Sequence, residues 1–185
     1  MVKRRTDWRA LAGRPSSPGL FEEALLPHLD VLYGLALRLT RDRDDAADLL
    51  QDAVLRGFER FHQLREPAAA RAWFVRILTR TFLNHYADRA GEDPLPDDAK
   101  SLFDDGPEAA LLRACDGREI EEALAELPDE FRLAVLLADI EGLALREIAD
   151  LCGCPVGTAA SRLARGRQRL RDRLAHLRRD RGTGA

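Results

Sequence analysis

Apolar residues recur every three to four positions through most of the chain, and this spacing predicts amphipathic helices. Within residues 20–87 the repeat is interrupted at 40–42 and again at 64–67, so it predicts three helices. Valine and isoleucine are few, and no alternating strand pattern is present. The apolar positions of the three helices are Leu25, Leu29, Leu32, Leu35, Ala36, Leu39, Leu49, Leu50, Val54, Phe58, Trp73, Phe74, Ile77, Leu78 and Phe82. We expect a helical bundle, with Trp73 and Phe74 in its core.

A change in composition divides the chain after this bundle. Residues 90–106 combine glycines and prolines with many carboxylates, a mixture that cannot sustain a helix or bury much surface. Helical spacing resumes after Pro107. The sequence therefore predicts an all-α fold with two small helical domains, 20–89 and 118–178. A flexible acidic linker, 90–117, joins them; a flexible basic arm, 1–19, precedes them and a tail, 179–185, follows.

The second domain ends in a pattern that predicts a helix-turn-helix. Two helical segments, 143–151 and 156–177, are joined by Cys-Gly-Cys-Pro at 152–155. Gly153 can adopt a positive φ at the turn, and Pro155 suits the start of the next helix. We expect Val156 and Leu163 to face inward. The residues expected on the outer surface of the second helix are Thr158, Ala159, Ser161, Arg162 and Arg165.

The charge distribution marks the same helix as a candidate DNA reader. The chain has 185 residues and a net charge of −3, yet residues 156–185 hold nine arginines against two acids. Arg162 and Arg165 can contact phosphates or guanines, and Thr158 and Ser161 can donate to phosphates or base edges. Alternate residues on a helix lie about 200° apart, so only some of Arg167, Arg169, Arg171 and Arg173 can touch DNA.

Other classes of function find little support. Cys115, Cys152 and Cys154 suit neither a disulfide framework nor a common zinc spacing, so a reducing cytoplasm is expected. For Cys152 and Cys154 a role as small buried residues is favoured over a redox or metal role. No signal peptide or membrane-spanning run is recognised, and no membrane insertion is expected. No catalytic motif is present either, which predicts a protein that is not an enzyme and needs no cofactor or metal.

Several motifs occur in a characteristic order and spacing. They are ALAELPDEFR at 123–132, EIA at 147–149, PVGT at 155–158 and SRL at 161–163. Together they resemble the fourth conserved region of extracytoplasmic-function sigma factors, of the sigma-70 family of bacterial RNA polymerase. DDAADLLQD at 44–52 and RAWFVRILTRTFLNHY at 71–86 resemble the second region of that family. The resemblance covers about residues 20–178 and implies a factor that binds core RNA polymerase and promoter DNA and helps to open the duplex.

Within this resemblance, one helix face is the candidate contact with polymerase. Asp45, Asp48 and Asp52 are spaced three and four residues apart and therefore share a face. The resemblance implies that this face, with Leu49 and Gln51, docks on the clamp helices of the β′ subunit. Simple solvation of the carboxylates is the alternative, and a metal site would need further ligands from another helix.

The resemblance also divides promoter recognition between the two domains. It implies that the third helix and the loop before it, residues 61–66, handle the minus-ten element, which requires a cationic track and a surface that holds an unstacked base. The candidates are His62, Gln63, Arg65, Arg76, Arg80, Asn84 and Tyr86. The second domain is expected to read the minus-thirty-five element through Thr158, Ser161, Arg162 and Arg165 and to contact the polymerase β flap. The resemblance also implies an anti-sigma factor as a further partner.

Two other hypotheses are compatible with parts of the pattern. The chain could be an autonomous helix-turn-helix regulator whose N-terminal bundle is a dimerisation or sensor module. Such a dimer should footprint a palindrome unaided, whereas a sigma factor should bind promoter DNA strongly only with core polymerase. A pure protein-interaction bundle would show no salt-dependent DNA binding, and the arginine-rich helix disfavours it.

Overall fold

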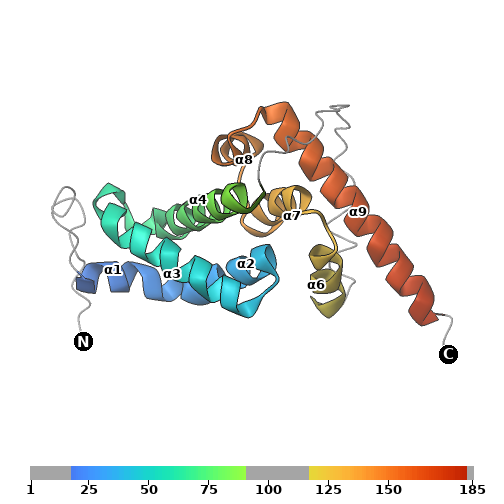
Figure 1. The fold of residues 1–185 in the computed structure, drawn as a ribbon, viewed down its shortest axis with the longest axis horizontal. Helices are drawn as coiled ribbons and strands as arrows, with labels where there is room; N and C mark the ends of the chain where they lie inside the picture. The colour runs from blue at the N-terminus through green and yellow to red at the C-terminus, as the bar shows by residue number, and fades with distance from the viewer. Residues whose placement is uncertain (1–17, 91–116, 183–185) are drawn as a thin grey trace. The chain divides into compact units, whose positions relative to one another are not determined.

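The computed structural model describes the backbone of residues 18–90 and 117–182 and the side chains of residues 18–85 and 117–175. The chain divides into two compact units, Met1–Gly91 and Glu92–Ala185. All regular structure in the described ranges is helical, which confirms the predicted all-α fold (Figure 1). None of the helices described is both long enough and apolar enough to span a bilayer. Most of the predicted basic arm, most of the acidic linker, the end of the tail and Cys115 lie outside the described residues; residues 18 and 19, predicted as part of the arm, instead begin α1.

Within its described residues, 18–90, the first unit contains four α-helices, α1 (Pro18–Leu25), α2 (Leu29–Thr40), α3 (Arg43–Arg60) and α4 (Ala70–Ala90). Short 3-10 turns separate some of them: η2 (Leu26–His28), η3 (Phe61–Gln63) and η4 (Pro67–Ala69). The sequence predicted three helices in this region, and the additional break falls at η2. Pro27 lies at the start of that turn and lacks the backbone N–H that would continue the helix.

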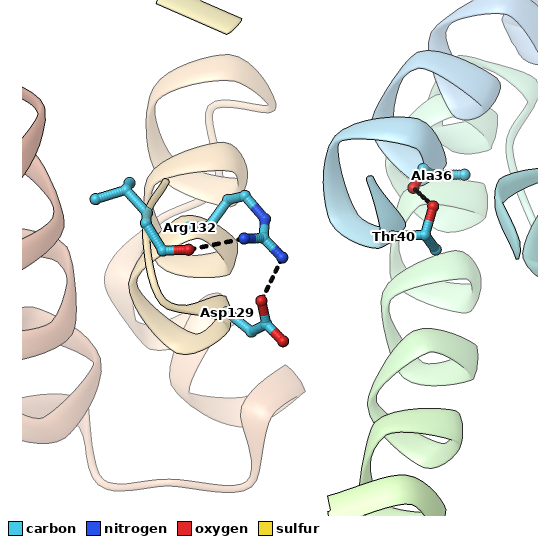
Figure 2. A network of polar contacts seen from close by, with 5 residues as sticks. Ala36, Thr40, Asp129 and Arg132 are labelled. Carbon is cyan, nitrogen blue, oxygen red and sulfur yellow. Dashed lines mark hydrogen bonds and ion pairs between the residues drawn. The ribbon is translucent and has the colours of Figure 1, made fainter. Parts of the chain in front are cut away.

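Local capping explains why α2 stops and α3 begins. Arg41 takes a left-handed conformation, with φ of 63°, and its N–H donates to the carbonyl of Leu37 at 2.8 Å. The Asp42 carboxylate then accepts from the backbone N–H groups of Asp44 at 2.8 Å and Asp45 at 3.0 Å. The Thr40 hydroxyl also lies 3.0 Å from the carbonyl oxygen of Ala36 (Figure 2). These contacts account for the break predicted at 40–42.

Aromatic rings fill the centre of the first unit. Phe21 packs edge-on against Phe61 and Phe74, with ring centroids 5.3 Å and 5.7 Å apart. Phe74 is buried as predicted, whereas Trp73 is only half-buried and packs on Phe74 with centroids 5.0 Å apart. A Cβ at Gly57 would lie 3.2 Å from the Phe74 ring, so this glycine lets α3 approach α4 closely.

The second unit contains α6 (Gly117–Ala125), α7 (Asp129–Val135), a π-helical turn η5 (Leu136–Ile140), α8 (Leu145–Cys152) and α9 (Val156–Gly182). The long helix α9 contacts α6, α7 and α8. Its inner face is formed by Ala159, Leu163, Gly166, Leu170 and Leu174, all of them buried. This spacing of three and four residues is the one that keeps side chains on a single helix face.

A buried arginine holds the turn between α6 and α7. Arg132 is only 1% exposed; its Nη1 donates to the carbonyl of Leu127 at 2.8 Å and its Nη2 to the Asp129 carboxylate at 2.5 Å (Figure 2). Pro128 lies between these two partners. The guanidinium therefore stabilises the turn by donating hydrogen bonds to a backbone carbonyl within it and to a carboxylate that offsets its charge.

Candidate nucleic-acid interface

The helix-turn-helix is formed by α8, the turn at 153–155 and α9. The Glu147 carboxylate accepts from the backbone N–H of Ala144 at 3.0 Å, one half of a capping box at the start of α8. The helix ends at Gly153, whose φ is 63°, as the sequence predicted. Cys154 N–H then donates to the carbonyl of Ala149 at 3.1 Å, which closes the C-terminal cap.

The first turns of α9 expose most of the residues predicted to read DNA. Arg165 is exposed, while Thr158, Ser161 and Arg162 are partly exposed. The Ser161 hydroxyl donates to the carbonyl of Thr158 at 2.9 Å, so its oxygen keeps lone pairs that can accept from a base amino group.

Two predictions about this helix are wrong. Ala159 was expected on the outer surface, but it is 1% exposed and belongs to the inner face. Val156 was expected to face inward, but it is 47% exposed. Val156 has nearly the same angular position as Leu163, yet it begins the helix, where its neighbours do not cover it. Helical spacing determines direction around the axis, and burial also requires a packing partner at that height.

The predicted docking helix α3 presents an acidic face. Asp48 and Gln51 are exposed, and Asp45 and Asp52 are partly exposed; we refer to these four residues as the acidic face of α3. Leu49 was predicted to belong to this face, and that prediction is wrong. Leu49 lies at the edge of this face, between Asp45 and Asp52, but it is 1% exposed because it packs into the core of the unit with the buried Ala46 and Ala53.

The predicted minus-ten residues come from one helix and the connection before it. Arg76, Arg80 and Asn84 follow one another at intervals of four on α4, and Arg80 and Asn84 are exposed. His62 and Gln63 lie on η3 and Arg65 lies between η3 and η4, and all three are exposed. The side chain of Tyr86 lies outside the described residues. The basic and polar side chains on α4 are therefore preceded in the chain by the exposed polar side chains of residues 62–65. Basic side chains of this kind are suited to contact the backbone of single-stranded DNA.

Comparison with known proteins identifies the family. The model of sigma-70 region 2 matches residues 25–92, and that of sigma-70 region 4 matches residues 117–170. The ECF RNA polymerase sigma factor SigE of Mycolicibacterium smegmatis is 37% identical over 186 residues, covering 92% of this chain and 72% of the relative. The chain belongs to the extracytoplasmic-function sigma factors of the sigma-70 family.

Other relatives of this sigma factor agree. The RNA polymerase sigma-H factor of Pseudomonas aeruginosa is 30% identical, covering 86% of this chain and 89% of the relative. Among solved structures, the sigma factor RpoE of Bartonella quintana, crystallised with the anti-sigma factor NepR, matches with a TM-score of 0.61. It is 27% identical and covers 84% of this chain and 96% of its own.

Membership of the family confirms the predicted function. The protein is not an enzyme; it binds core RNA polymerase and promoter DNA and directs promoter-specific transcription initiation. The hypotheses of an autonomous regulator and of a pure interaction bundle are therefore set aside.

Several arginines of this sigma factor's α9 are engaged within the second unit. Arg167 holds the Asp139 carboxylate through two hydrogen bonds, of 3.2 Å from Nε and 2.7 Å from Nη2. Arg173 contacts Glu126 at 2.6 Å, and the Arg169 guanidinium lies 4.9 Å from the centre of the Phe131 ring. These three cations stabilise the packing of the middle of α9 on its own unit.

The two cysteines of the turn are partly buried and form no disulfide. The pKa of the Cys152 thiol is raised to about 11, mainly by burial and to a lesser extent by the neighbouring Cys154, while Arg162 acts to lower it. Cys152 is therefore a protonated thiol at neutral pH, which suits a packing role. In the part of the chain that the structure describes, no group of three or more potential ligands could hold a metal ion.

Sequence reasoning missed one contact at the acidic face of this sigma factor. Nε2 of His85, on α4, lies 3.1 Å from Oδ2 of Asp52 on α3. Both side chains are partly exposed, so this contact adds little to stability. It nevertheless links the candidate docking helix to the candidate minus-ten helix. No sequence signal could have found it, because the two residues lie on different helices.

Proposed function

We propose that this sigma factor divides its work between the two units. Residues 20–89 hold core polymerase and melt the minus-ten element, residues 118–178 read the minus-thirty-five element, and residues 90–117 link them. The single observation that carries this assignment is the opposite charge of the two candidate surfaces: carboxylates on the acidic face of α3, and arginines on the exposed part of α9.

The acidic face of α3 docks on the clamp helices of the β′ subunit. Four helical positions on one side of α3 carry three carboxylates and an amide, and the opposite side is anchored in the core. A rigid surface of one charge favours a basic partner and accelerates encounter with it. This supports the acidic face as the docking surface, without Leu49.

The minus-ten element is opened by α4 and the connection that precedes it. Arg76 and Arg80 contact phosphates of the separated DNA strand. Asn84 and Tyr86, further along α4, bind the same strand. His62, Gln63 and Arg65 form hydrogen bonds with an extruded base. All three side chains are exposed in the segment between α3 and α4, which supports a role in base contact.

The minus-thirty-five element is read by Thr158, Ser161, Arg162 and Arg165. Their place in the N-terminal half of α9, where Arg165 is exposed and Thr158, Ser161 and Arg162 are partly exposed, supports this choice. Ala160 and Ala164 leave fewer long side chains for base contacts, and Arg162 and Arg165 therefore supply most of them. The same unit contacts the β flap of polymerase.

Regulation by an anti-sigma factor completes the proposal. The structurally similar RpoE of Bartonella quintana was crystallised with the anti-sigma factor NepR. A protein that covers the acidic face of α3 and the exposed part of α9 would block both polymerase and promoter. We place this control, like the activity, in the cytoplasm with RNA polymerase.

Reconstituted transcription tests the assignment. The full chain and core polymerase are combined on a randomised promoter library, and transcripts are sequenced to obtain the recognised elements. Asp48→Arg should weaken binding to core enzyme by about 100-fold, because a charge reversal places like charges together. Thermal unfolding should be unchanged, because Asp48 is exposed. Normal co-purification of this variant with core polymerase would refute docking by α3.

A further inference from the structure

An exposed leucine lies in the middle of the acidic side of α3. Leu55 is 56% exposed, and among the described residues only Leu26 is a large apolar side chain of greater exposure. Removing a leucine side chain from water is favourable, so a leucine left exposed on a well-packed helix can supply binding energy to a partner that covers it.

Polar residues flank Leu55 along most of the exposed face of α3. Asp52 precedes it by three residues, Gln51 by four and Asp48 by seven, while Glu59 follows it by four. At these intervals all four share the helix face of Leu55. Phe58, three residues further on, is 36% exposed and packs edge-on against Phe21, so it forms a firm apolar border. An apolar centre within a polar rim is the usual arrangement at a binding hot spot.

The helix holds Leu55 in this position. Leu49, Ala53 and Gly57 lie on the opposite side of α3 and are buried, and together with the capped start at Asp42 they fix its rotation. The side chain of Leu55 therefore points outward from a rigid support, and little conformational entropy of the backbone is lost when a partner binds.

We propose that Leu55 is the central apolar contact of the docking surface, and that it inserts into an apolar pocket ringed by basic side chains on core RNA polymerase. The inference rests on the proposed docking of α3 and names the residue that supplies affinity there. The charge around Leu55 indicates the chemistry of its partner. Asp48, Asp52 and Glu59 lie around Leu55, so the surface that binds it should carry basic side chains around its apolar pocket. Arg56 does not offset these carboxylates at the centre of the face, because it lies at the partly buried edge. The carboxylates determine approach and specificity, and Leu55 determines how slowly the complex dissociates.

The experiment compares full-length variants in binding to core polymerase by titration with a fluorescently labelled sigma factor. Leu55→Ala should raise the Kd about tenfold, mainly through faster dissociation, whereas Leu55→Met, which keeps the apolar volume, should remain within about threefold. Leu26→Ala is the matched control: the same truncation at a leucine of 63% exposure outside α3, expected to leave the Kd unchanged. Because Leu55 is exposed, its truncation should not lower the unfolding temperature.

The salt dependence of binding to core polymerase distinguishes the contribution of Leu55 from that of the surrounding carboxylates. Leu55→Ala should weaken binding equally at low and high salt, whereas Asp48→Arg should weaken it most at low salt. If Asp48→Arg impairs binding and Leu55→Ala does not, the role of Leu55 is overturned while docking by α3 stands. If neither variant impairs binding, docking by α3 is itself wrong. A loss in Leu26→Ala as large as that in Leu55→Ala would also overturn the proposal.

Discussion

Gly166 has no Cβ atom, and this allows α9 to pack closely against α7. A Cβ at this position of α9 would lie 2.7 Å from Cγ2 of Val135 and 3.0 Å from the carbonyl oxygen of Phe131, both on α7. The first distance is shorter than side-chain atoms in proteins tolerate, and the second involves backbone that cannot easily move. Gly166 is therefore required for the contact between α7 and α9.

Gly166→Ala should lower the free energy of unfolding by about 1–3 kcal/mol, because overpacking displaces one helix from the other. Gly157→Ala is the matched control on the same helix: nothing lies within 4 Å of its Cβ position. That variant should gain up to about 1 kcal/mol from the better helix propensity of alanine. Urea unfolding followed by circular dichroism measures both. Equal stability of Gly166→Ala and wild type would contradict the packing argument.

Cys152 is the residue at which protonation and folding are coupled. The pKa of its thiol rises from 9.0 to about 11 in the folded protein. At pH 8 the folded chain therefore carries about a hundredfold less Cys152 thiolate than the unfolded chain, and iodoacetamide should alkylate it correspondingly slowly. Mass spectrometry of peptides from native and urea-unfolded protein measures the ratio. Equal rates in the two states would contradict the burial of this thiol.

The same pKa shift predicts a pH dependence of stability. Because the folded-state pKa is the higher one, the stabilising contribution of Cys152 is complete below about pH 9 and is lost as the pH rises towards about 11. Cys152→Ser should remove this part of the pH dependence, since serine does not titrate in that range.

At the scale of the element, α9 carries arginines that hold its own unit together and arginines that we propose contact DNA. Arg167 and Arg173 reach Asp139 and Glu126, and Arg169 covers the Phe131 ring, so these arginines attach the middle of the helix to its own unit. Arg165 lies one turn earlier and is exposed. On the proposed assignment, position along the helix, not arginine content, separates the arginines that stabilise the unit from those that contact DNA.

Arg165→Ala and Arg167→Ala should separate these tasks. Arg165→Ala should weaken binding to the upstream element by about 1–3 kcal/mol; if the contact is to a phosphate, the slope of log affinity against log salt should fall by about 1. Arg167→Ala should leave that slope unchanged and lower stability by up to about 1 kcal/mol, because the ion pair is only partly buried. Filter binding of the polymerase complex over a salt series provides the comparison. A reduced salt slope in Arg167→Ala would contradict the assignment.

At the scale of the whole molecule, each unit has a core of its own. Aromatic rings and leucines fill the first unit, and the inner face of α9 with α6, α7 and α8 fills the second. A domain with its own core can fold alone. The residues proposed for polymerase docking and those proposed for upstream recognition therefore lie in units that can fold separately.

Cutting the chain between Gly91 and Glu92 should yield two folded fragments. Each should show a helical circular dichroism spectrum and a cooperative thermal transition. Residues 1–91 should retain binding to core polymerase without footprinting the upstream element, since α9 is in the other fragment. An unfolded 1–91 fragment would contradict the independence of the first unit, and loss of polymerase binding by a folded fragment would contradict the docking assignment.

The sequence by itself determined the helical fold, the main breaks between helices and the family. The breaks follow from local chemistry: Asp42 caps the helix that follows it, and Gly153 takes the positive φ that ends α8. The polar faces follow from spacing, because residues three and four apart share a side of a helix wherever that helix packs. Order and spacing of the motifs were sufficient for the family, since they reflect the same local constraints.

Only the tertiary structure decided which side of each helix is covered and which charges are engaged. It buried Leu49 and exposed Leu55 on α3, and it buried Ala159 and exposed Val156 on α9. It paired Arg167 with a carboxylate 28 residues away and Arg173 with one 47 residues away. Periodicity gives the angle between two side chains on one helix, but burial and ion pairing depend on atoms of other elements, which meet only when the chain folds.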